Sequence, residues 1–268
     1  MIKRLPNGRW QARHRPVPGG QQVARNFDRK LDATRWLDEQ KAAVLTGQYV
    51  DPRAGRVTFR EYAEAWRAAQ VHRPSTVANL ESLLRRHAYP RFGDRPLASI
   101  RPSEVQAWAK GLALAPATVG VVHAAMSSIM KAAVRDRILV SNPCEGTKLP
   151  RQQRAPVVPM TLEQVEAVRA GTPHHLQALV TLGAGTGMRP SELTGLTVDR
   201  LHMLRREVVV DQQLVTLTGQ PPQLGPPKTQ ASVRTVPLPH AVVDALAAHL
   251  AEYEPGDLGV VFCDHLGR

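Results

Sequence analysis

Two short stretches in the second half of the sequence combine residue types that can bind a phosphate group. The first is Thr186-Gly-Met-Arg-Pro-Ser-Glu-Leu193, in which Arg189 follows a glycine-rich break and precedes Pro190. Proline is tolerated in the first turn of a helix, so the pattern predicts a short helix. Its start would present the Arg189 guanidinium and several free backbone N–H groups to an anion. Glu192, three residues further on, is placed to orient that arginine, although a glycine-terminated helix with a surface ion pair is the plainer interpretation.

The second stretch contains a lysine and one more arginine. It reads Pro227-Lys-Thr229, followed by Ser232-Val-Arg-Thr-Val-Pro-Leu-Pro239. The Gly- and Pro-rich segment 219–227 is expected to be an irregular connection that delivers Lys228. Because nearby arginines can lower the pKa of a lysine, this residue type suits a general acid.

In this order and spacing, the two stretches resemble the first catalytic box and the lysine-bearing β-hairpin of the tyrosine recombinases, the phage-integrase family. The resemblance implies that Arg189 contacts the scissile phosphate, that Glu192 supports the site and that Lys228 is the acid for the 5′ leaving oxygen. Family members cleave DNA by attack of a Tyr hydroxyl, which gives a 3′-phosphotyrosyl link without a metal or other cofactor. The implied function is a site-specific integrase of a mobile element, which takes no small-molecule substrate.

The family's remaining catalytic parts, a His-x-x-Arg box and a Tyr nucleophile, have no clear counterpart in these 268 residues. His265 and Arg268 have the spacing, but they directly follow a strand expected at 258–263 and lack helical surroundings. Tyr253 is expected to pack with the apolar face of its helix. We therefore expect a C-terminally truncated recombinase that binds DNA but cannot cleave it. The alternative is a catalytically inactive DNA-binding remnant that occupies attachment sites.

The composition independently favours a nucleic-acid partner. The formal net charge is +12, and such a field attracts a polyanion before any sequence is read. No segment is expected to approach the roughly 20 apolar residues that span a bilayer, which argues against a membrane. Cys144 and Cys263 lie far apart without metal-ligand spacing, which indicates a reduced, intracellular protein. With the family resemblance, the expected location is the cytoplasm, in a bacterial or phage-encoded, nucleoid-associated protein. An RNA-binding or ribosomal protein would explain the charge but not the two stretches, and a type IB topoisomerase fits the small basic N-terminal region less well.

The expected fold is multidomain and mainly α. Residues 1–50 are expected to form a small basic module. Apolar and basic side chains nearly alternate at 8–15, which is typical of a strand, a second short strand is predicted at 23–27, and a helix at 32–45. The resemblance implies a three-stranded sheet plus a helix that binds arm-type DNA sites. The candidate contacts in this region are Arg9, Arg13 and Arg15.

Residues 56–142 are expected to form a helical domain, with helices at 59–69, 75–88, 102–112 and 116–134. The apolar stripe of the last helix is predicted to be core. The region resembles the four-helix, SAM-like core-binding domain that clamps core-type DNA sites in the family. The candidate phosphate contacts are Arg73, Ser75, Thr76, Lys131 and Arg135.

A basic linker is expected at 143–159, followed by part of an α+β catalytic domain at 160–268. Its strands are predicted at 207–211, 232–237 and 258–263. Complete recombinases of this kind act as tetramers on paired double-stranded attachment sites.

Overall fold

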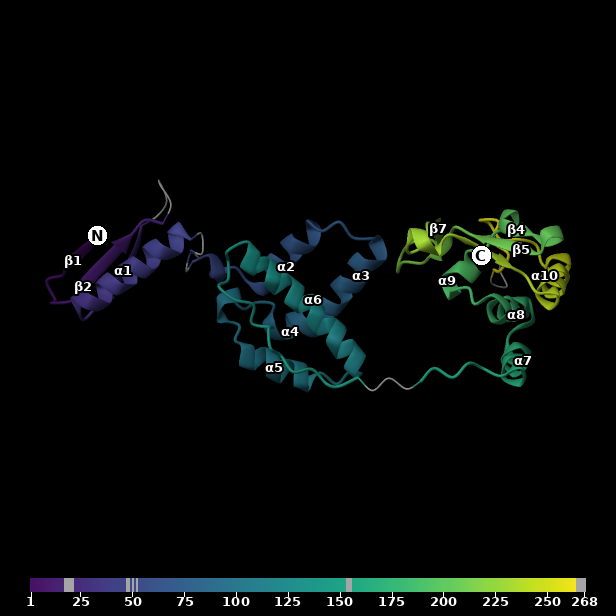
Figure 1. Cartoon of the computed structure of the whole chain (residues 1–268), viewed down its shortest axis with the longest axis horizontal. Coiled ribbons are helices and arrows are strands. Elements are labelled where there is room, and N and C mark those ends of the chain that lie inside the picture. Colours follow the sequence, from purple (N-terminus) through teal and green to yellow (C-terminus); the bar gives the residue numbers. More distant parts are fainter. Residues whose placement is uncertain (17–21, 47–48, 50, 52, 153–155, 264–268) are drawn as a thin grey trace. The chain divides into compact units, whose positions relative to one another are not determined.

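The structure is a computed structural model that describes residues 1–16, 22–46, 49, 51, 53–152 and 156–263 (Figure 1). The chain divides into two compact units, Met1–Gln153 and Arg154–Arg268. His265 and Arg268, whose spacing was noted above, lie outside the described residues.

The N-terminal region is a small antiparallel sheet covered by one helix, which confirms the predicted three strands plus helix. The strands β1 (Ile2–Arg4), β2 (Trp10–His14) and β3 (Val23–Phe27) pair in the order β1-β2-β3, and α1 (Lys30–Leu45) follows. Ala12 on β2 and Ala33 on α1 are fully buried. Small side chains at both positions let the helix approach the sheet closely.

A helical bundle follows, built from α2 (Phe59–Ala68), α3 (Pro74–Leu83), α5 (Pro102–Gly111) and α6 (Pro116–Arg135). Thr58 begins α2 with a capping box, in which its hydroxyl accepts from the Glu61 N–H and the Glu61 side chain accepts from the Thr58 N–H. Such a cap satisfies N–H groups that the first helical turn leaves unpaired.

The apolar stripe of α6 forms the centre of this bundle, as predicted. Its fully buried residues include Val119, Val122, Met126 and Ile129. Among the described residues, α6 is the one helix that is long and apolar enough to cross a membrane, by length and composition only. No such segment was predicted from the sequence. Because the stripe packs against the other helices, we assign α6 as a core helix of the bundle.

The helix predicted at 75–88 is interrupted. After α3, the backbone forms a π-helical turn at Leu84–Ala88 and then α4 (Tyr89–Phe92). A π-turn shifts the hydrogen-bonding pattern and frees backbone carbonyls. Trp108 of α5 donates its Nε1–H to the His87 carbonyl at 2.9 Å. This bond between the turn and α5 gives the His87 carbonyl a donor that it would otherwise lack.

The packed part of the first unit continues into the region expected to be linker. Cys144 is only 2% exposed, and its backbone N–H donates to the side chain of the buried Asn142. Burial raises the pKa of the Cys144 thiol to about 12. The expected linker at 143–159 therefore begins with residues that belong to the bundle core, and residues 153–155 within it lie outside the described part.

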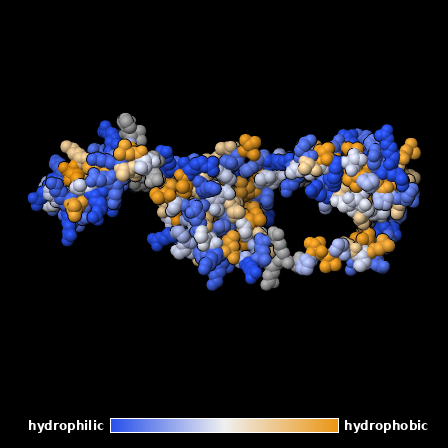
Figure 2. Space-filling view, viewed as in Figure 1, coloured by the Kyte–Doolittle hydropathy of each residue, from blue (hydrophilic) through white to orange (hydrophobic). Residues whose placement is uncertain are grey.

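The second unit places helices against a three-stranded antiparallel sheet of order β4-β5-β8. The strands are β4 (Leu201–His202), β5 (Glu207–Val210) and β8 (Arg234–Pro237), and the helices are α7 (Leu162–Gly171), α8 (Gln177–Thr186), α9 (Pro190–Thr194) and α10 (His240–Glu252). The core contains Leu182, Val208 and Leu246. Figure 2 shows hydrophilic side chains over much of the visible surface of both units, with small hydrophobic patches interspersed among the hydrophilic residues.

Two predictions in this unit were wrong in detail. The segment 219–227, expected to be irregular, contains the strand β7 (Gln223–Gly225), which pairs with β6 (Gln213–Val215) in a separate hairpin. The strand expected at 258–263 is only a single bridge, between Val260 and Thr197. Val260, Val261 and Phe262 are buried, but the segment has no continuous strand partner.

Candidate active site

The candidate site begins where α8 ends and the chain reverses. Gly187 has a φ of +63°, in the left-handed region that glycine adopts without strain. The Thr186 hydroxyl donates to the Leu182 carbonyl at 2.5 Å, which satisfies a carbonyl in the last turn of α8. Met188 is buried after the reversal, so Arg189 stands at the start of α9.

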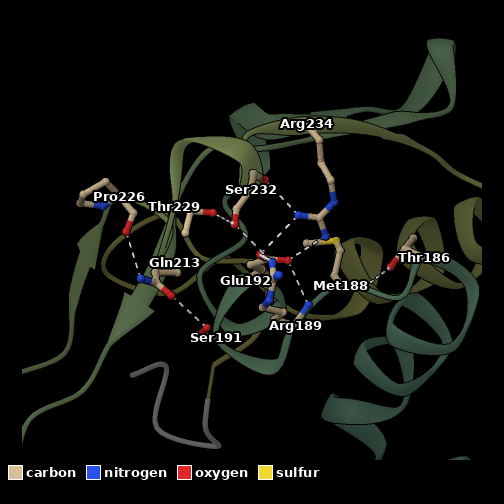
Figure 3. Close-up of polar contacts among 10 residues, drawn as sticks. All are labelled: Thr186, Met188, Arg189, Ser191, Glu192, Gln213, Pro226, Thr229, Ser232 and Arg234. Atoms are coloured by element: carbon tan, nitrogen blue, oxygen red, sulfur yellow. Dashed lines mark hydrogen bonds and ion pairs between the residues drawn. The ribbon is translucent and has the colours of Figure 1, made fainter. Parts of the chain in front are cut away.

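Glu192 lies at the centre of the polar contacts drawn in Figure 3. Its side chain is 2% exposed and receives hydrogen bonds from two arginines on different elements. Arg189 donates Nη1 to Glu192 Oε1 at 2.8 Å and its backbone N–H to Oε2 at 3.0 Å. Arg234 of β8 donates Nη2 to Oε2 at 2.8 Å and Nη1 to Oε1 at 3.3 Å. The contact between Arg189 and Glu192 that their spacing predicted is therefore present.

These contacts fix the charge of the buried carboxylate. Burial raises the pKa of Glu192, but hydrogen bonds from Arg234 and from the backbone and side chain of Arg189 outweigh it and lower the pKa to about 2. The group is therefore ionised at any physiological pH and holds both guanidinium groups.

Arg189 remains open to solvent although its partner is buried. Its side chain is 59% exposed, and its Nε and Nη2 atoms donate to no acceptor within the described part of the chain. Of the backbone N–H groups expected beside it, those of Glu192 and Leu193 are not available, because both donate to the Arg189 carbonyl. The guanidinium is therefore the main donor that this turn offers to an anion.

The residues after Lys228 are tied to the same network. Ser232 is buried, accepts a long hydrogen bond of 3.4 Å from Arg189 Nη1, and shares a hydrogen bond of 2.9 Å with the Thr229 hydroxyl. Lys228 itself is exposed. The structure thus connects the segment that carries Lys228 to the turn that carries Arg189.

The candidate DNA contacts of the N-terminal region lie together. Arg13 is exposed and next to the buried Ala12 on β2, so the two side chains lie on opposite faces of the sheet. Arg15 is exposed directly after the end of β2. Arg9 precedes β2 and pairs with Asp28 at 2.9 Å. Arg13 also donates Nε to the Gln11 side chain at 2.7 Å. The open face of this sheet is therefore polar and basic.

The candidates of the bundle form two groups. Arg73 is the N-cap of α3, and Ser75 and Thr76 follow in its first turn, all three exposed. Lys131 and Arg135 are exposed one turn apart on α6. Their contact with DNA stays a prediction.

Two residues of the site were not predicted from the sequence. Arg234 stands within the Ser-x-Arg motif, so the motif itself could have identified it as a site residue. Gln213 connects α9 with the segment before Lys228, and no sequence pattern singles it out.

Comparisons with known proteins cover nearly the whole chain. Residues 1–46 match the family of the phage integrase N-terminal domain, and residues 58–113 match that of the phage integrase N-terminal SAM-like domain. The prophage phiRv2 integrase of Mycobacterium tuberculosis is 29% identical, over 97% of this chain and 72% of that protein. The integrase of Mycobacterium phage D29 is 26% identical, over 92% of this chain and 68% of that protein.

Solved structures show the same fold. The Tn1549 transposon integrase in complex with a circular intermediate DNA is 25% identical, with a TM-score of 0.69 over 78% of this chain and 72% of that chain. A lambda integrase tetramer bound to a Holliday junction is 14% identical, with a TM-score of 0.57 over 100% of this chain and 78% of that chain, and this likeness concerns the fold alone.

Proposed function

Because this chain belongs to the tyrosine recombinase family of phage integrases, we propose that Arg189, Glu192 and Lys228 are its share of the phosphate-binding site of a site-specific DNA recombinase. The family activity is strand cleavage and rejoining through a 3′-phosphotyrosyl intermediate. The observation that carries the assignment of residues is the Glu192 network, which holds an exposed guanidinium next to the segment of Lys228.

Arg189 is suited to bind the non-bridging oxygens of the scissile phosphate. Charge builds up on these oxygens as the tyrosine attacks, and a donor that is already oriented stabilises that charge without reorganisation. A guanidinium is permanently charged and can donate two parallel hydrogen bonds. Glu192 occupies Nη1, which leaves Nε and Nη2 for the phosphate.

Lys228 is proposed to protonate the 5′ oxygen as it leaves. The chemistry requires a proton donor on the leaving-group side, and an exposed ammonium group on a flexible stem can reach it. The contacts of Thr229 and Ser232 limit where that stem begins.

The basic surfaces of the first unit are proposed to hold the duplex. We assign Arg9, Arg13 and Arg15 to arm-type sites, and the exposed groups of α3 and α6 to the phosphates of core-type sites. A soluble, intracellular, nucleoid-associated protein that forms tetramers on paired sites is consistent with the relatives, which are integrases of phages and prophages.

DNA binding tests the first part of this proposal. The affinity for a fluorescent duplex should fall by about 10³–10⁵ between 50 and 200 mM salt, if roughly 6–10 phosphates are neutralised. Anisotropy titrations at several salt concentrations give the slope of log affinity against log salt. A flat response would contradict the assignment of these surfaces to DNA.

Covalent chemistry tests the second part. Residues 1–268 offer no His-x-x-Arg box followed by a tyrosine. We propose that this polypeptide by itself binds attachment-site DNA without forming a phosphotyrosyl link. A labelled duplex that stayed attached to the protein in SDS would contradict this.

A further inference from the structure

We infer that Gln213 is a positioning residue for Lys228, because its side chain fastens the strand that leads to the lysine onto the helix that begins at Arg189. This inference rests on the proposed function, in which the two cationic groups act on one phosphate. It concerns a residue that binds neither the phosphate nor the DNA.

The side-chain amide of Gln213 bridges two segments that are far apart in the sequence (Figure 3). Ser191, in the first turn of α9, donates its hydroxyl to Gln213 Oε1 at 3.1 Å. Gln213 in turn donates Nε2 to the backbone carbonyl of Pro226 at 2.9 Å. Ser191 lies two residues after Arg189, and Pro226 lies two residues before Lys228. One side chain therefore spans the distance between the backbones of the two proposed catalytic groups.

The residue type fits this task. An amide carries an acceptor and a donor on one rigid group, so it can join a hydroxyl to a carbonyl. A hydrocarbon of the same length could make neither bond, and a carboxylate could accept from Ser191 but could not donate to Pro226.

A close backbone contact brings Gln213 to α9. A Cβ added to Gly195, at the C-terminal end of α9, would lie 2.3 Å from the Leu214 nitrogen and 2.6 Å from the Gln213 carbonyl carbon. Real side chains do not tolerate such distances, so only glycine permits β6 to lie here. Gln212 adds a hydrogen bond from Nε2 to the Gly195 carbonyl at 3.1 Å.

The hairpin needs this attachment. β6 and β7 form a two-stranded sheet of their own, with three paired residues in each strand. An isolated hairpin of this size is marginally stable in water. Its position, and with it the exit toward Lys228, is therefore set by the contacts with α9.

Lys228 is thus held from both sides. Before it, Pro226 is bonded to Gln213; after it, Thr229 is bonded to Ser232, which is bonded to Arg189. The side chain of the lysine stays exposed while its backbone is anchored on either side. This arrangement restricts the base of a long, flexible side chain and leaves its ammonium group free to reach a phosphate.

Limited proteolysis with endoproteinase Lys-C, which cuts after lysine, measures the mobility of this segment directly. Two variants separate hydrogen bonding from packing: Gln213→Met keeps the volume and loses both bonds, and Gln213→Glu keeps the bond from Ser191 and loses the bond to Pro226. Gln223→Met is the matched control, because Gln223 is exposed on the partner strand of the same hairpin. Cleavage after Lys148 serves as the internal reference.

We expect cleavage after Lys228 to become about 3- to 10-fold faster in Gln213→Glu, the factor associated with the loss of one hydrogen bond, and at least as much faster in Gln213→Met, which loses both. The control should cleave like the wild type. If Gln213→Met or Gln213→Glu leaves the rate unchanged, the inference is overturned. Hydrogen exchange of β5 and β8 should stay as in the wild type, and a general loss of protection there would also overturn the specific role.

A spectroscopic signature of Lys228 separates positioning from general stability. After reductive ¹³C-methylation of the lysines, the Lys228 signal is identified by its loss in Lys228→Arg. In both Gln213 variants this signal should sharpen and move toward that of a freely mobile lysine, and an unchanged signal would contradict the inference. Duplex affinity should stay within about 2-fold, because Gln213 is not a phosphate contact. Failure of the proposed function would instead appear as a flat salt response, with the effects on Lys228 unaltered.

Discussion

Two carboxylates held by arginine, one in each unit, show how similar contacts serve different purposes. In the bundle, Glu64 accepts hydrogen bonds from Arg67, at 2.6 and 3.1 Å, and from the Tyr89 hydroxyl at 2.5 Å. There the arginine is the enclosed partner, with 18% of its side chain exposed, and it also binds Glu81. In the second unit the enclosed partner is the carboxylate of Glu192, whose side chain is 2% exposed, while the Arg189 side chain is 59% exposed.

The difference lies in where the remaining donors point. Arg67 directs its hydrogen bonds to two carboxylates of its own domain, so its network links α2 to α3 and adds stability. Glu192 holds Arg189 through one nitrogen and leaves others toward solvent. An arginine that is fixed by a buried carboxylate and still exposed is oriented for a ligand outside the protein. This contrast predicts that perturbing one network impairs chemistry and that perturbing the other impairs folding.

The largest expected effect is that of Arg189→Ala on cleavage. In a recombinase that carries these residues together with its tyrosine, the rate of strand cleavage should fall by about 10²–10³, as for the loss of one preorganised donor. Arg67→Ala is the matched variant and should leave the cleavage rate per folded molecule unchanged. An unchanged rate in Arg189→Ala would remove this residue from the site.

The next effect concerns stability and its dependence on pH. The pKa of Glu192 is about 2 in the folded chain and ordinarily about 4.3 when unfolded, so its network should contribute roughly 2–3 kcal/mol above pH 5. Because the folded pKa is the lower one, this contribution is lost as the pH falls from about 5 to about 2. Glu192→Gln should therefore destabilise the second unit at neutral pH, and the difference from the wild type should shrink in acid.

Each unit needs its own probe for this measurement. Tryptophan fluorescence reports on the first unit alone, because all four tryptophans lie there: Trp10, Trp36, Trp66 and Trp108. The stability of the second unit is therefore measured by hydrogen exchange of β5 and β8. Glu64→Gln, followed by tryptophan fluorescence in urea, should cost the bundle only about 1 kcal/mol, because the Glu64 side chain is 40% exposed. A cost of Glu192→Gln that did not change with pH would contradict the ionised network.

The smallest effects distinguish the outer members of the two networks. Tyr89→Phe removes the hydroxyl that donates to Glu64 and should destabilise the bundle by about 1 kcal/mol. In a recombinase that carries these residues together with its tyrosine, Ser232→Ala removes the long bond to Arg189 and should slow cleavage by about 2- to 5-fold with little change in stability. Urea unfolding measures the stability effect of Tyr89→Phe, and single-turnover kinetics measure the cleavage effect of Ser232→Ala. If Tyr89→Phe slowed cleavage and Ser232→Ala only destabilised the protein, the roles given to the two networks would be wrong.

Much of the fold follows from the sequence because local signals and packing agree. Thr58 and Thr161 carry capping boxes that begin α2 and α7, and the apolar stripe of α6 is the bundle core as predicted. The pairing of Arg189 with Glu192 follows from helical spacing. These features depend on residues close together in the chain.

The features that were missed depend on contacts between distant segments. Nothing local indicates that the helix after Ser75 forms a π-turn at Leu84, where the Trp108 indole binds a carbonyl. The Gly- and Pro-rich stretch at 219–222 indicates a turn, but nothing local indicates the short strands beside it, which are held by α9, an element that precedes them in the sequence. Apolar residues at 258–263 suggested a strand, but burial alone does not supply a strand partner.

The β6–β7 hairpin also has a consequence for engineering. Its strands are paired from Gln213 to Val215, and the seven residues 216–222 connect them at the end far from the contacts with α9. Lengthening such a connection costs little closure entropy, and exposed loop tips tolerate inserted sequence. A peptide tag or a small reporter could be placed between Gly219 and Pro222 while the base of the hairpin keeps its contacts, which makes this loop a site for labelling the second unit close to its chemistry.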